Sequence, residues 1–512
     1  MKKDQVKAGA ALSLVSLLIS NLIPFIYTPL MLRILGQAEY GLLGIANSFM
    51  SFINLLNFGI GGTIVRYIVK YRASGDTAGE ERIFGLFIKI YSVIGLAILA
   101  AGTLLALNLD FYDRSLTGAE LDLLKKLILL MTLNTALFLP LSPFGSMIAA
   151  HERFVFSKLA SMTFTLGGPV LNLIMLYLGY GSLGLVAASV VCNILSCLLQ
   201  VFYVFKVIRL RPRFGKVGGG ILKEILGFSV FVFLAQIVDM LYWATDKVII
   251  GWAIGTSGTA VYNIGASFNV YVTAISTAIS GVLLPRITSM AVKDTPKEEF
   301  TGLFIKVGRL QFLVLSFIVS AFVAFGKQFI GLWAGDGYQD AYYVALLTMI
   351  PVTLPLIQNT GLSMLYAMNK HQFRSIVYAI IAVLNVVLTF CWVESFGIVG
   401  AAVATCLAYI VGNVFIMNWF YYKRIGIDIP LFWRNILKMS PVMFVMGTAW
   451  WFLLDVLTVN SWLRFFGLAV AYAVMYFPLA YRFMMNDYEK NLIREPVMKL
   501  LRKLHIIKTL EE

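Results

Sequence analysis

The chain alternates long apolar stretches with short polar ones, and this pattern predicts membrane-spanning helices. A run of about 20 apolar residues is long enough to cross a bilayer as a helix. About fourteen such runs recur along the sequence. Their approximate centres are residues 20, 51, 96, 136, 169, 195, 239, 272, 319, 352, 384, 409, 446 and 473. We therefore expect an all-α polytopic membrane protein with about fourteen transmembrane helices, whose even number returns both ends of the chain to one side.

The sequence also contains an internal repeat. The matching segments are 35–49 with 254–268, 85–89 with 302–306, 170–172 with 383–385, and Gly181 and Gly184 with Gly397 and Gly400. An even number of expected helices separates the two copies, so both copies start on the same side of the membrane. Such a parallel repeat predicts two bundles related by a pseudo-twofold axis along the membrane normal.

The repeat sets the expected domain organisation. The expected parts are an N-terminal six-helix bundle at 1–210, a cytoplasmic linker at 211–224, a C-terminal six-helix bundle at 225–425, transmembrane helices 13 and 14 at 426–482, and a basic cytoplasmic tail at 483–512. The joint between the bundles, from Arg209 to Lys223, contains the sequence RLRPRFGKVGGG, whose proline and glycines are typical of a connecting segment. Two halves that rock around a central site are the mechanism that this organisation implies.

Charge gives the expected orientation. The chain is 60% hydrophobic and carries 41 Lys and Arg residues. Of these basic residues, 34 lie in alternate loops that include both ends of the chain, and the positive-inside rule places such loops in the cytoplasm. The formal net charge of +15 is therefore mostly a matter of topology. Because the cations are spread over many loops and do not gather on one face, we do not expect a nucleic-acid partner.

Signatures of enzyme chemistry are not found in the sequence. The four cysteines lie in apolar segments without paired spacing, and the three histidines occupy separate polar segments. No glycine-rich phosphate loop followed by Lys-Ser or Lys-Thr occurs. We therefore expect no catalytic residue, no metal site and no cofactor.

The segment from Phe228 to Gly255 is unusual because it carries charges at membrane depth. Asp239, Asp246 and Lys247 interrupt an otherwise apolar run. A charge at the bilayer centre costs a few kcal/mol, so such residues usually face protein or water and mark an ion or substrate path. At helical spacing, four residues share one stripe, which predicts a hydrated cavity: Gln236, Asp239, Trp243 and Asp246. Polar residues in the first, second and eighth expected helices, such as Asn54, place that cavity between these helices and the seventh.

Three stretches resemble a known family. They are YTPLMLRILGQAEYGLLGIANSF at 27–49, GTIVRY at 62–67 and DKVIIGWAIGTSGTAVYNIGASF at 246–268. The sequence resembles, over nearly its whole length, the Wzx-type oligosaccharide flippases of the multidrug/oligosaccharidyl-lipid/polysaccharide exporter superfamily. The resemblance implies a secondary transporter in the cytoplasmic (inner) membrane, with both termini in the cytoplasm. It would move undecaprenyl-pyrophosphate-linked oligosaccharide to the outer leaflet for cell-surface polysaccharide synthesis. The partners implied are the lipid-linked oligosaccharide, the bilayer, a polysaccharide polymerase and chain-length proteins.

That substrate gives the intramembrane charges a role. A cationic, hydrated cavity could hold the pyrophosphate and sugar while the polyprenyl tail stays in lipid. The substrate-binding residues expected on this basis are Arg33, Arg66, Lys89, Lys247, Arg286, Lys306, Asn54 and Trp243. Several of these cations lie near cytoplasmic helix ends, where topology alone would also explain them. Asp239 and Asp246 would couple transport to a proton or a sodium ion, or they would be structural carboxylates inside the bundle.

Two other functions stay open on the sequence. A multidrug cation/proton antiporter of the same superfamily would need a net acidic cavity. A membrane glycosyltransferase or polymerase acting on the same lipid-linked sugars would need an exposed catalytic site, commonly on a large external loop. The external loops expected here are short, and the repeat suits alternating access better.

Overall fold

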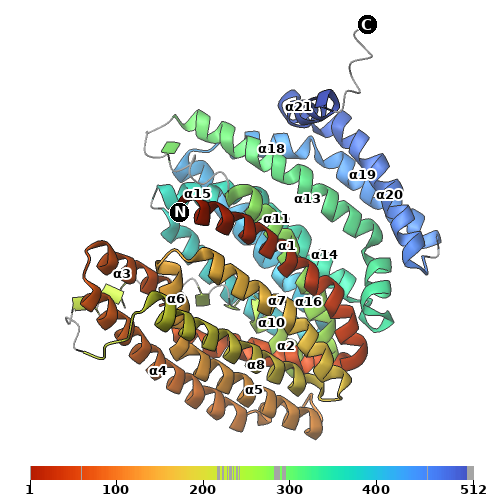
Figure 1. Cartoon of the computed structure of the whole chain (residues 1–512). Coiled ribbons are helices and arrows are strands. Elements are labelled where there is room, and N and C mark those ends of the chain that lie inside the picture. Colours follow the sequence, from red (N-terminus) through yellow and green to blue (C-terminus); the bar gives the residue numbers. More distant parts are fainter. Residues whose placement is uncertain are drawn as a thin grey trace. The chain divides into compact units, whose positions relative to one another are not determined.

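The structure is a computed structural model, and it describes residues 2–503 apart from a set of short gaps. The gaps are 59, 216–219, 222, 223, 226, 228, 230–232, 234, 235, 238, 239, 242, 282–288, 291–295, 369 and 458. Every regular element within the described residues is helical (Figure 1). The first helices are α1 (Lys2–Leu35), α2 (Gln37–Asn54), α3 (Gly61–Ala73), α4 (Thr77–Leu107), α5 (Gly118–Phe138), α6 (Ser142–Ala150), α7 (Phe154–Tyr177) and α8 (Gly181–Tyr203). The later helices are α10 (Thr245–Ala253), α11 (Thr256–Gly281), α13 (Lys297–Ala334), α14 (Ala341–Ile357), α15 (Asn359–Ala367), α16 (His371–Tyr409), α17 (Asn418–Phe420), α18 (Ile429–Leu437), α19 (Ser440–Val456), α20 (Trp462–Leu479) and α21 (Asp487–Lys503).

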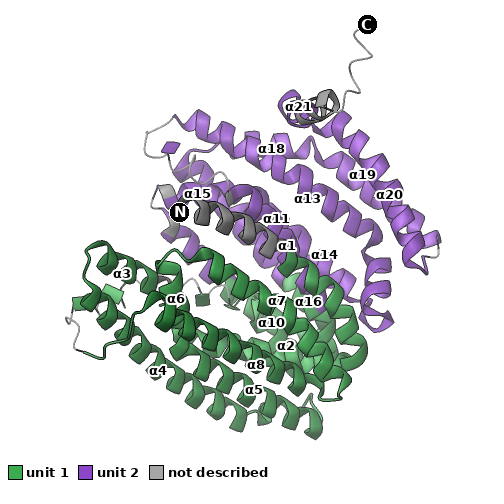
Figure 2. Ribbon diagram, in the orientation of Figure 1, with its two compact units in different colours: residues 1–263, 382–404 green, residues 264–381, 405–512 purple. Residues whose placement is uncertain are grey.

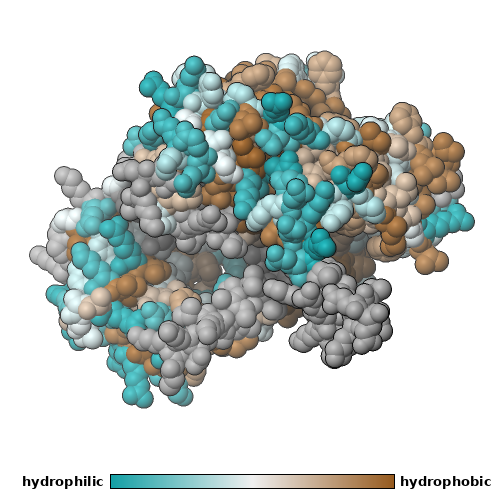
Figure 3. Space-filling view, turned by 90° about the horizontal axis from the view of Figure 1, so that it is seen from above, coloured by the Kyte–Doolittle hydropathy of each residue, from teal (hydrophilic) through white to brown (hydrophobic). Residues whose placement is uncertain are grey.

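The helices are long and apolar, as a membrane protein requires. Within the described residues, 8 helices could each cross a membrane by length and composition, and up to 10 spans result if each of two bent pairs is counted as one. One of these helical stretches runs from Gln372 to Ile425, which is long enough for two of the expected spans. Hydrophobic residues form broad areas on the surface shown in Figure 3, and Val456 and Leu463 are each more than 80% exposed. The expected all-helical, polytopic membrane protein is therefore confirmed.

The chain forms two compact units (Figure 2). Unit 1 comprises residues 1–263 and 382–404, and unit 2 comprises residues 264–381 and 405–512. In unit 1, α4 packs against α5, and α7 packs against α1 and α8. In unit 2, α13 packs against α14 and α19. The residue ranges of these units differ from those of the two bundles expected from the repeat. The two bundles stay a prediction.

Glycines matched by the internal repeat share an uncommon backbone conformation. Gly36 has φ of 81° and its repeat partner Gly255 has φ of 94°; Gly181 and Gly397 have φ of 53° and 62°. Residues with a Cβ rarely adopt positive φ, because the Cβ crowds the following carbonyl oxygen. Gly36 and Gly255 each lie between two helices, Gly181 begins α8, and Gly397 interrupts α16. The local backbone therefore agrees with the repeat seen in the sequence.

The beginning of the expected linker is held against α4. Residues 209–215 have no regular structure. The backbone N–H of Arg213 donates to the carbonyl oxygen of Glu81 at 2.9 Å, and the Arg213 guanidinium pairs with the Glu81 carboxylate at 2.7 Å. This part of the linker is thus fixed to unit 1.

Candidate functional site

Hydrogen bonds from a neighbouring loop fix α10 within unit 1. The hydroxyl of Tyr112 donates to the carbonyl oxygen of Val248, and the hydroxyl of Ser115 donates to that of Gly251, both at 2.8 Å. A Cβ at Gly251 would come within 2.6 Å of the Ile45 side chain, so glycine allows α2 and α10 to pack closely. These contacts determine which side chains of α10 face α2.

A polar cavity of about 490 Å³ lies beside α2 and the segment 236–247 in unit 1. It is lined by Asn47, Ser48, Ser51, Asn54, Leu55, Asn57, Gln236, Met240, Trp243, Ala244 and Lys247. Amide and hydroxyl groups therefore make up most of one wall. Because water or polar ligands must satisfy such groups at membrane depth, this cavity is the candidate substrate site.

Helical spacing explains the two walls. Asn47, Ser51 and Asn54 recur every three or four residues and so share one face of α2. On the opposite wall, Gln236 and Trp243 are seven residues apart and again share a face. The described positions between Gly220 and Trp243 are helical, and Ala244 interrupts the helix before α10 begins.

Lys247 carries the charge of this cavity. It is half-buried, and it is the only charged residue among the described residues that line the cavity. An ammonium group in a cavity of amides and hydroxyls can donate hydrogen bonds to an anion such as a phosphate. The cavity is therefore suited to an anionic group with polar substituents.

Asp246 faces a different neighbourhood. It is only 1% exposed, and its carboxylate accepts hydrogen bonds from the Tyr262 hydroxyl at 2.5 Å and the Thr389 hydroxyl at 3.1 Å. The side-chain amide of Asn385 donates to it at 3.4 Å. Tyr262 belongs to α11, and the other two partners belong to α16. The predicted stripe shared by Trp243 and Asp246 is thus wrong, because Trp243 faces the cavity while Asp246 is buried against α11 and α16.

The other predicted site residues are dispersed. Asn54, Trp243 and Lys247 meet at the cavity, whereas Arg33 on α1 and Arg66 on α3 are exposed and are not among its lining residues. Lys89 on α4 is exposed and lies over the ring of Phe214, 5.5 Å from its centroid. In unit 2, Lys306 on α13 lies 3.5 Å from the ring centroid of Tyr488. Asp239 and Arg286 lie outside the described residues. All of these assignments stay predictions.

The sequence did not identify the partners of Asp246. Tyr262 follows Asp246 by 16 residues, and Asn385 and Thr389 by 139 and 143. Asn385 falls in the repeat match with residue 172, and Thr389 stands one turn further along the same helix. The four-residue step from Asn385 to Thr389 is visible in the sequence and places both side chains on one face of a helix. No local feature of the sequence links that face to Asp246.

Two relatives have names that describe a transport activity. The chain is 24% identical over 287 residues to the probable low-salt glycan biosynthesis flippase Agl15 of Haloferax volcanii, a match that covers 53% of this chain and 57% of that protein. It is 20% identical over 409 residues to a putative O-antigen transporter of Shigella flexneri, covering 77% of this chain and 92% of that one. The matched region thus spans little more than half of the Haloferax protein.

Solved structures share the fold. The structure matches the lipid II flippase MurJ in an inward closed conformation with a TM-score of 0.72 and 14% identity, over 93% of this chain and 99% of that one. It matches an inward-facing multidrug resistance MATE family transporter of the MOP superfamily with a TM-score of 0.62 and 15% identity, over 82% of this chain and 96% of that one. The chain therefore shares its fold with these two proteins.

The family follows from a match to the chain's own sequence. The family model described as polysaccharide biosynthesis protein matches residues 6–291, which is more than half of the 512 residues. That region contains most of α1, all of α2 to α8, the cavity with Lys247, and α10 and α11. The chain belongs to the polysaccharide biosynthesis protein family.

Proposed function

We propose that this protein is a flippase that moves undecaprenyl-pyrophosphate-linked oligosaccharide from the cytoplasmic to the outer leaflet of the cell membrane. The observation that carries the proposal is the cavity of unit 1, where Lys247 stands among amides and hydroxyls. The names of the two relatives, a glycan flippase and an O-antigen transporter, support a lipid-linked glycan as substrate.

The chemistry of the cavity suits both parts of such a head group. The pyrophosphate is an anion and finds its counter-charge in Lys247, while sugar hydroxyls can exchange hydrogen bonds with Asn47, Ser51 and Asn54. The aromatic face of Trp243 can lie against a sugar ring. The polyprenyl tail needs no protein cavity because it stays in the hydrocarbon.

We propose that about fourteen transmembrane helices form two six-helix bundles and an appended pair, with both termini in the cytoplasm. The left-handed glycines shared by the two repeats support this organisation. Transport would then proceed by alternating access, as one bundle rocks against the other. A polysaccharide polymerase and chain-length proteins would use the exported product.

We further propose that an ion gradient drives the cycle and that Asp246 takes part in coupling. Its carboxylate is buried with three polar partners, so binding or release of a proton or sodium ion there would change the packing of α10 against α11 and α16. Asp239 has the same proposed role from its position in the sequence. Arg33, Arg66, Lys89, Arg286 and Lys306 would guide the anionic head group toward or away from the cavity.

A multidrug cation exporter is less well supported. Such a protein would need acidic groups in its cavity, but the charged residue among the described lining residues is a lysine. A cationic drug would be repelled by that charge.

The experiment that tests the proposal combines genetics with reconstitution. Deleting the gene should remove surface polysaccharide and cause the lipid-linked oligosaccharide to accumulate in the inner leaflet. Purified protein in proteoliposomes should expose that oligosaccharide, extracted from the deletion strain, to an external glycosidase. Normal surface polysaccharide in the deletion strain, together with no translocation in vesicles, would refute the proposal.

A further inference from the structure

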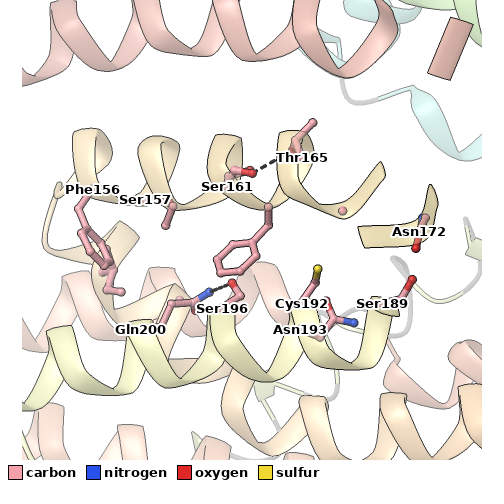
Figure 4. Close-up of a pocket in the computed structure, with 15 residues that line it drawn as sticks. Phe156, Ser157, Ser161, Thr165, Asn172, Ser189, Cys192, Asn193, Ser196 and Gln200 are labelled. Carbon is pink, nitrogen blue, oxygen red and sulfur yellow. Dashed lines mark hydrogen bonds between the residues drawn. The ribbon is translucent and has the colours of Figure 1, made fainter. Parts of the chain in front are cut away.

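A second cavity lies between α7 and α8 in unit 1 (Figure 4). Its volume is about 460 Å³, which falls within the range of about 300–1,000 Å³ that is usual for small-ligand pockets. Its polar lining consists of Ser157, Ser161, Thr165, Asn172, Ser189, Asn193, Ser196 and Gln200. The rest of the lining is Gly145, Ile148, Phe156, Ala160, Phe164, Gly168 and Cys192.

The polar residues form two facing stripes. Ser157, Ser161 and Thr165 recur every four residues on α7, and Asn193, Ser196 and Gln200 recur every three or four residues on α8. Each set therefore occupies one face of its helix. Figure 4 shows the two stripes on opposite sides of one space. The sequence thus places polar groups on the same side of two helices that would otherwise be apolar.

These residues are within helices long and apolar enough to span the membrane. The two helices concerned run from Phe154 to Tyr177 and from Gly181 to Ile208. The hydroxyls of Thr165 and Ser189 donate to backbone carbonyl oxygens one turn earlier in their own helices. Amides facing hydrocarbon would lose their hydrogen bonds with water, at a cost of several kcal/mol for each unsatisfied group. A stripe of this kind is therefore expected to face water or a polar ligand rather than lipid.

The amides retain hydrogen-bonding capacity after their contacts within the protein. The Asn193 side chain donates to the side-chain amide oxygen Oδ1 of Asn134 at 3.3 Å, and the Gln200 side chain donates to the Ser196 hydroxyl at 3.2 Å. A primary amide has two N–H donors and a carbonyl acceptor, so each of these contacts uses one of its groups. Each amide can thus still donate to and accept from a hydroxyl group of a ligand.

The lining is neutral and also offers aromatic surface. No Asp, Glu, Lys, Arg or His is among the described residues that line this cavity. Phe164 lines it, and Phe156 is stacked on Tyr203 with ring centroids 3.8 Å apart. Without a charge the cavity has no preference for phosphate. Paired hydroxyl and amide groups beside an aromatic ring instead match a sugar, which has hydroxyls around its edge and an apolar C–H face.

We propose that the cavity between α7 and α8 binds neutral sugar rings of the transported glycan, separately from the cavity that contains Lys247. The inference rests on the proposed function. It assigns the two parts of the substrate head group to two sites: Lys247 binds the pyrophosphate, and the neutral cavity binds the sugars. The α7–α8 cavity would then determine which glycans the protein accepts.

The test compares two ligands on the full-length protein in lipid nanodiscs. One is the lipid-linked oligosaccharide extracted from the deletion strain, and the other is undecaprenyl pyrophosphate without sugar. The double variant Asn193→Leu with Gln200→Leu should weaken binding of the oligosaccharide lipid about tenfold or more, since each removed partner leaves a sugar hydroxyl unpaired. Binding of undecaprenyl pyrophosphate should stay within about twofold of the parent.

A second double variant, which makes smaller changes, and a matched control accompany this variant. The double variant Ser157→Ala with Ser161→Ala removes two hydroxyls without adding volume. It should weaken binding of the oligosaccharide lipid and leave binding of undecaprenyl pyrophosphate unchanged. Thr163→Val on α7 alters a hydroxyl that donates to the carbonyl oxygen of Leu159 and does not line the cavity, so it should change neither affinity.

The outcomes separate this inference from the proposed function. If the parent binds neither lipid, the glycan-flippase proposal fails. If it binds both lipids equally, the sugar contributes nothing to binding, and the sugar site between α7 and α8 is refuted while the proposed function stands. If the parent prefers the oligosaccharide lipid and well-folded Ser157→Ala/Ser161→Ala and Asn193→Leu/Gln200→Leu proteins keep that preference, the sugar site between α7 and α8 is refuted while the proposed function stands.

Discussion

Arg309 and Glu489 are 180 residues apart in sequence and form a two-pronged ion pair inside unit 2. The Arg309 Nε and Nη2 atoms donate to the two carboxylate oxygens of Glu489 at 2.7 and 2.8 Å. Their side chains are 8% and 2% exposed, and Nη2 also donates to the carbonyl oxygen of Met484 at 2.8 Å. The pair thereby holds the start of α21 against α13.

Glu489→Gln should destabilise the protein, because it leaves the Arg309 charge buried without its partner. Removing one member of a buried ion pair typically costs about 3–5 kcal/mol. Thermal unfolding of the purified protein in detergent should show a clearly lower midpoint. Glu495→Gln is the matched control on the exposed part of α21 and should shift stability by less than about 0.5 kcal/mol. An unchanged midpoint for Glu489→Gln would contradict the assigned role of the pair.

Replacing Lys247 by Met should abolish or strongly reduce glycan export while leaving the amount of folded protein unchanged. The side chain keeps its length, but the phosphate loses its counter-charge. Surface polysaccharide and vesicle translocation measure the effect. Lys327→Met, in α13 of unit 2, is the matched lysine control and should retain export. Full export by a well-expressed Lys247→Met protein would remove Lys247 from the substrate site.

Asp246→Asn tests ion coupling. The amide keeps the shape of the carboxyl group but no longer titrates, so the variant should bind substrate and lose its response to a proton or sodium gradient. Two measurements are needed, namely the yield of detergent-stable protein and translocation with and without each gradient. A purely structural carboxylate predicts the opposite pattern, with lower yield and normal coupling in the protein that folds. A well-folded variant with the parental gradient response would exclude Asp246 as the coupling residue.

The glycines with positive φ should differ in their tolerance of alanine. At Gly36 a Cβ meets no atom within 4 Å, so Gly36→Ala should cost only the backbone strain of about 1–2 kcal/mol. At Gly255 a Cβ would also lie 2.9 Å from the carbonyl oxygen of Ser115, so Gly255→Ala should cost more. Gly467→Ala, in the open part of α20, should be neutral or slightly stabilising. Equal thermal unfolding midpoints for Gly36→Ala and Gly255→Ala would show that the close approach to Ser115 does not affect stability.

Topology can be tested by single cysteines in a background without the four native ones. Ser74→Cys and Arg211→Cys should react with an impermeant reagent only after the cells are opened. Asp113→Cys, on an exposed loop expected outside, should react in intact cells. External labelling at Ser74 or Arg211 would reverse the proposed orientation.

Helix positions could be predicted from the sequence because apolar length is a local property. The run centred near residue 96 is α4, and the run centred near 169 is α7. The same local reasoning could have found the facing stripes of α7 and α8, since their Ser, Thr, Asn and Gln residues recur at helical spacing. These two helices carry few charges, so no charge at membrane depth marks their polar stripes.

Side-chain neighbours could not be predicted in the same way. The helix is interrupted at Ala244, and beyond it Lys247 lines the cavity whereas Asp246 does not. The contact between Asp246 and Thr389 joins positions 143 residues apart. Such contacts depend on how helices rotate and pack together, which apolar periodicity alone leaves undetermined.

The turn at Gly36 also has a consequence for how the protein is made. A single residue separates α1 from α2, and the two helices differ in direction by 118°. No intervening loop is available to be translocated by itself, so in the proposed topology the pair enters the bilayer from the ribosome as one hairpin. Arg33, in the last turn of α1, costs up to about 3 kcal/mol to insert, and the apolar residues of both helices together can offset that cost. In the proposed topology we therefore expect α1 and α2 to insert together, and a longer connection at Gly36 would let them insert one after the other.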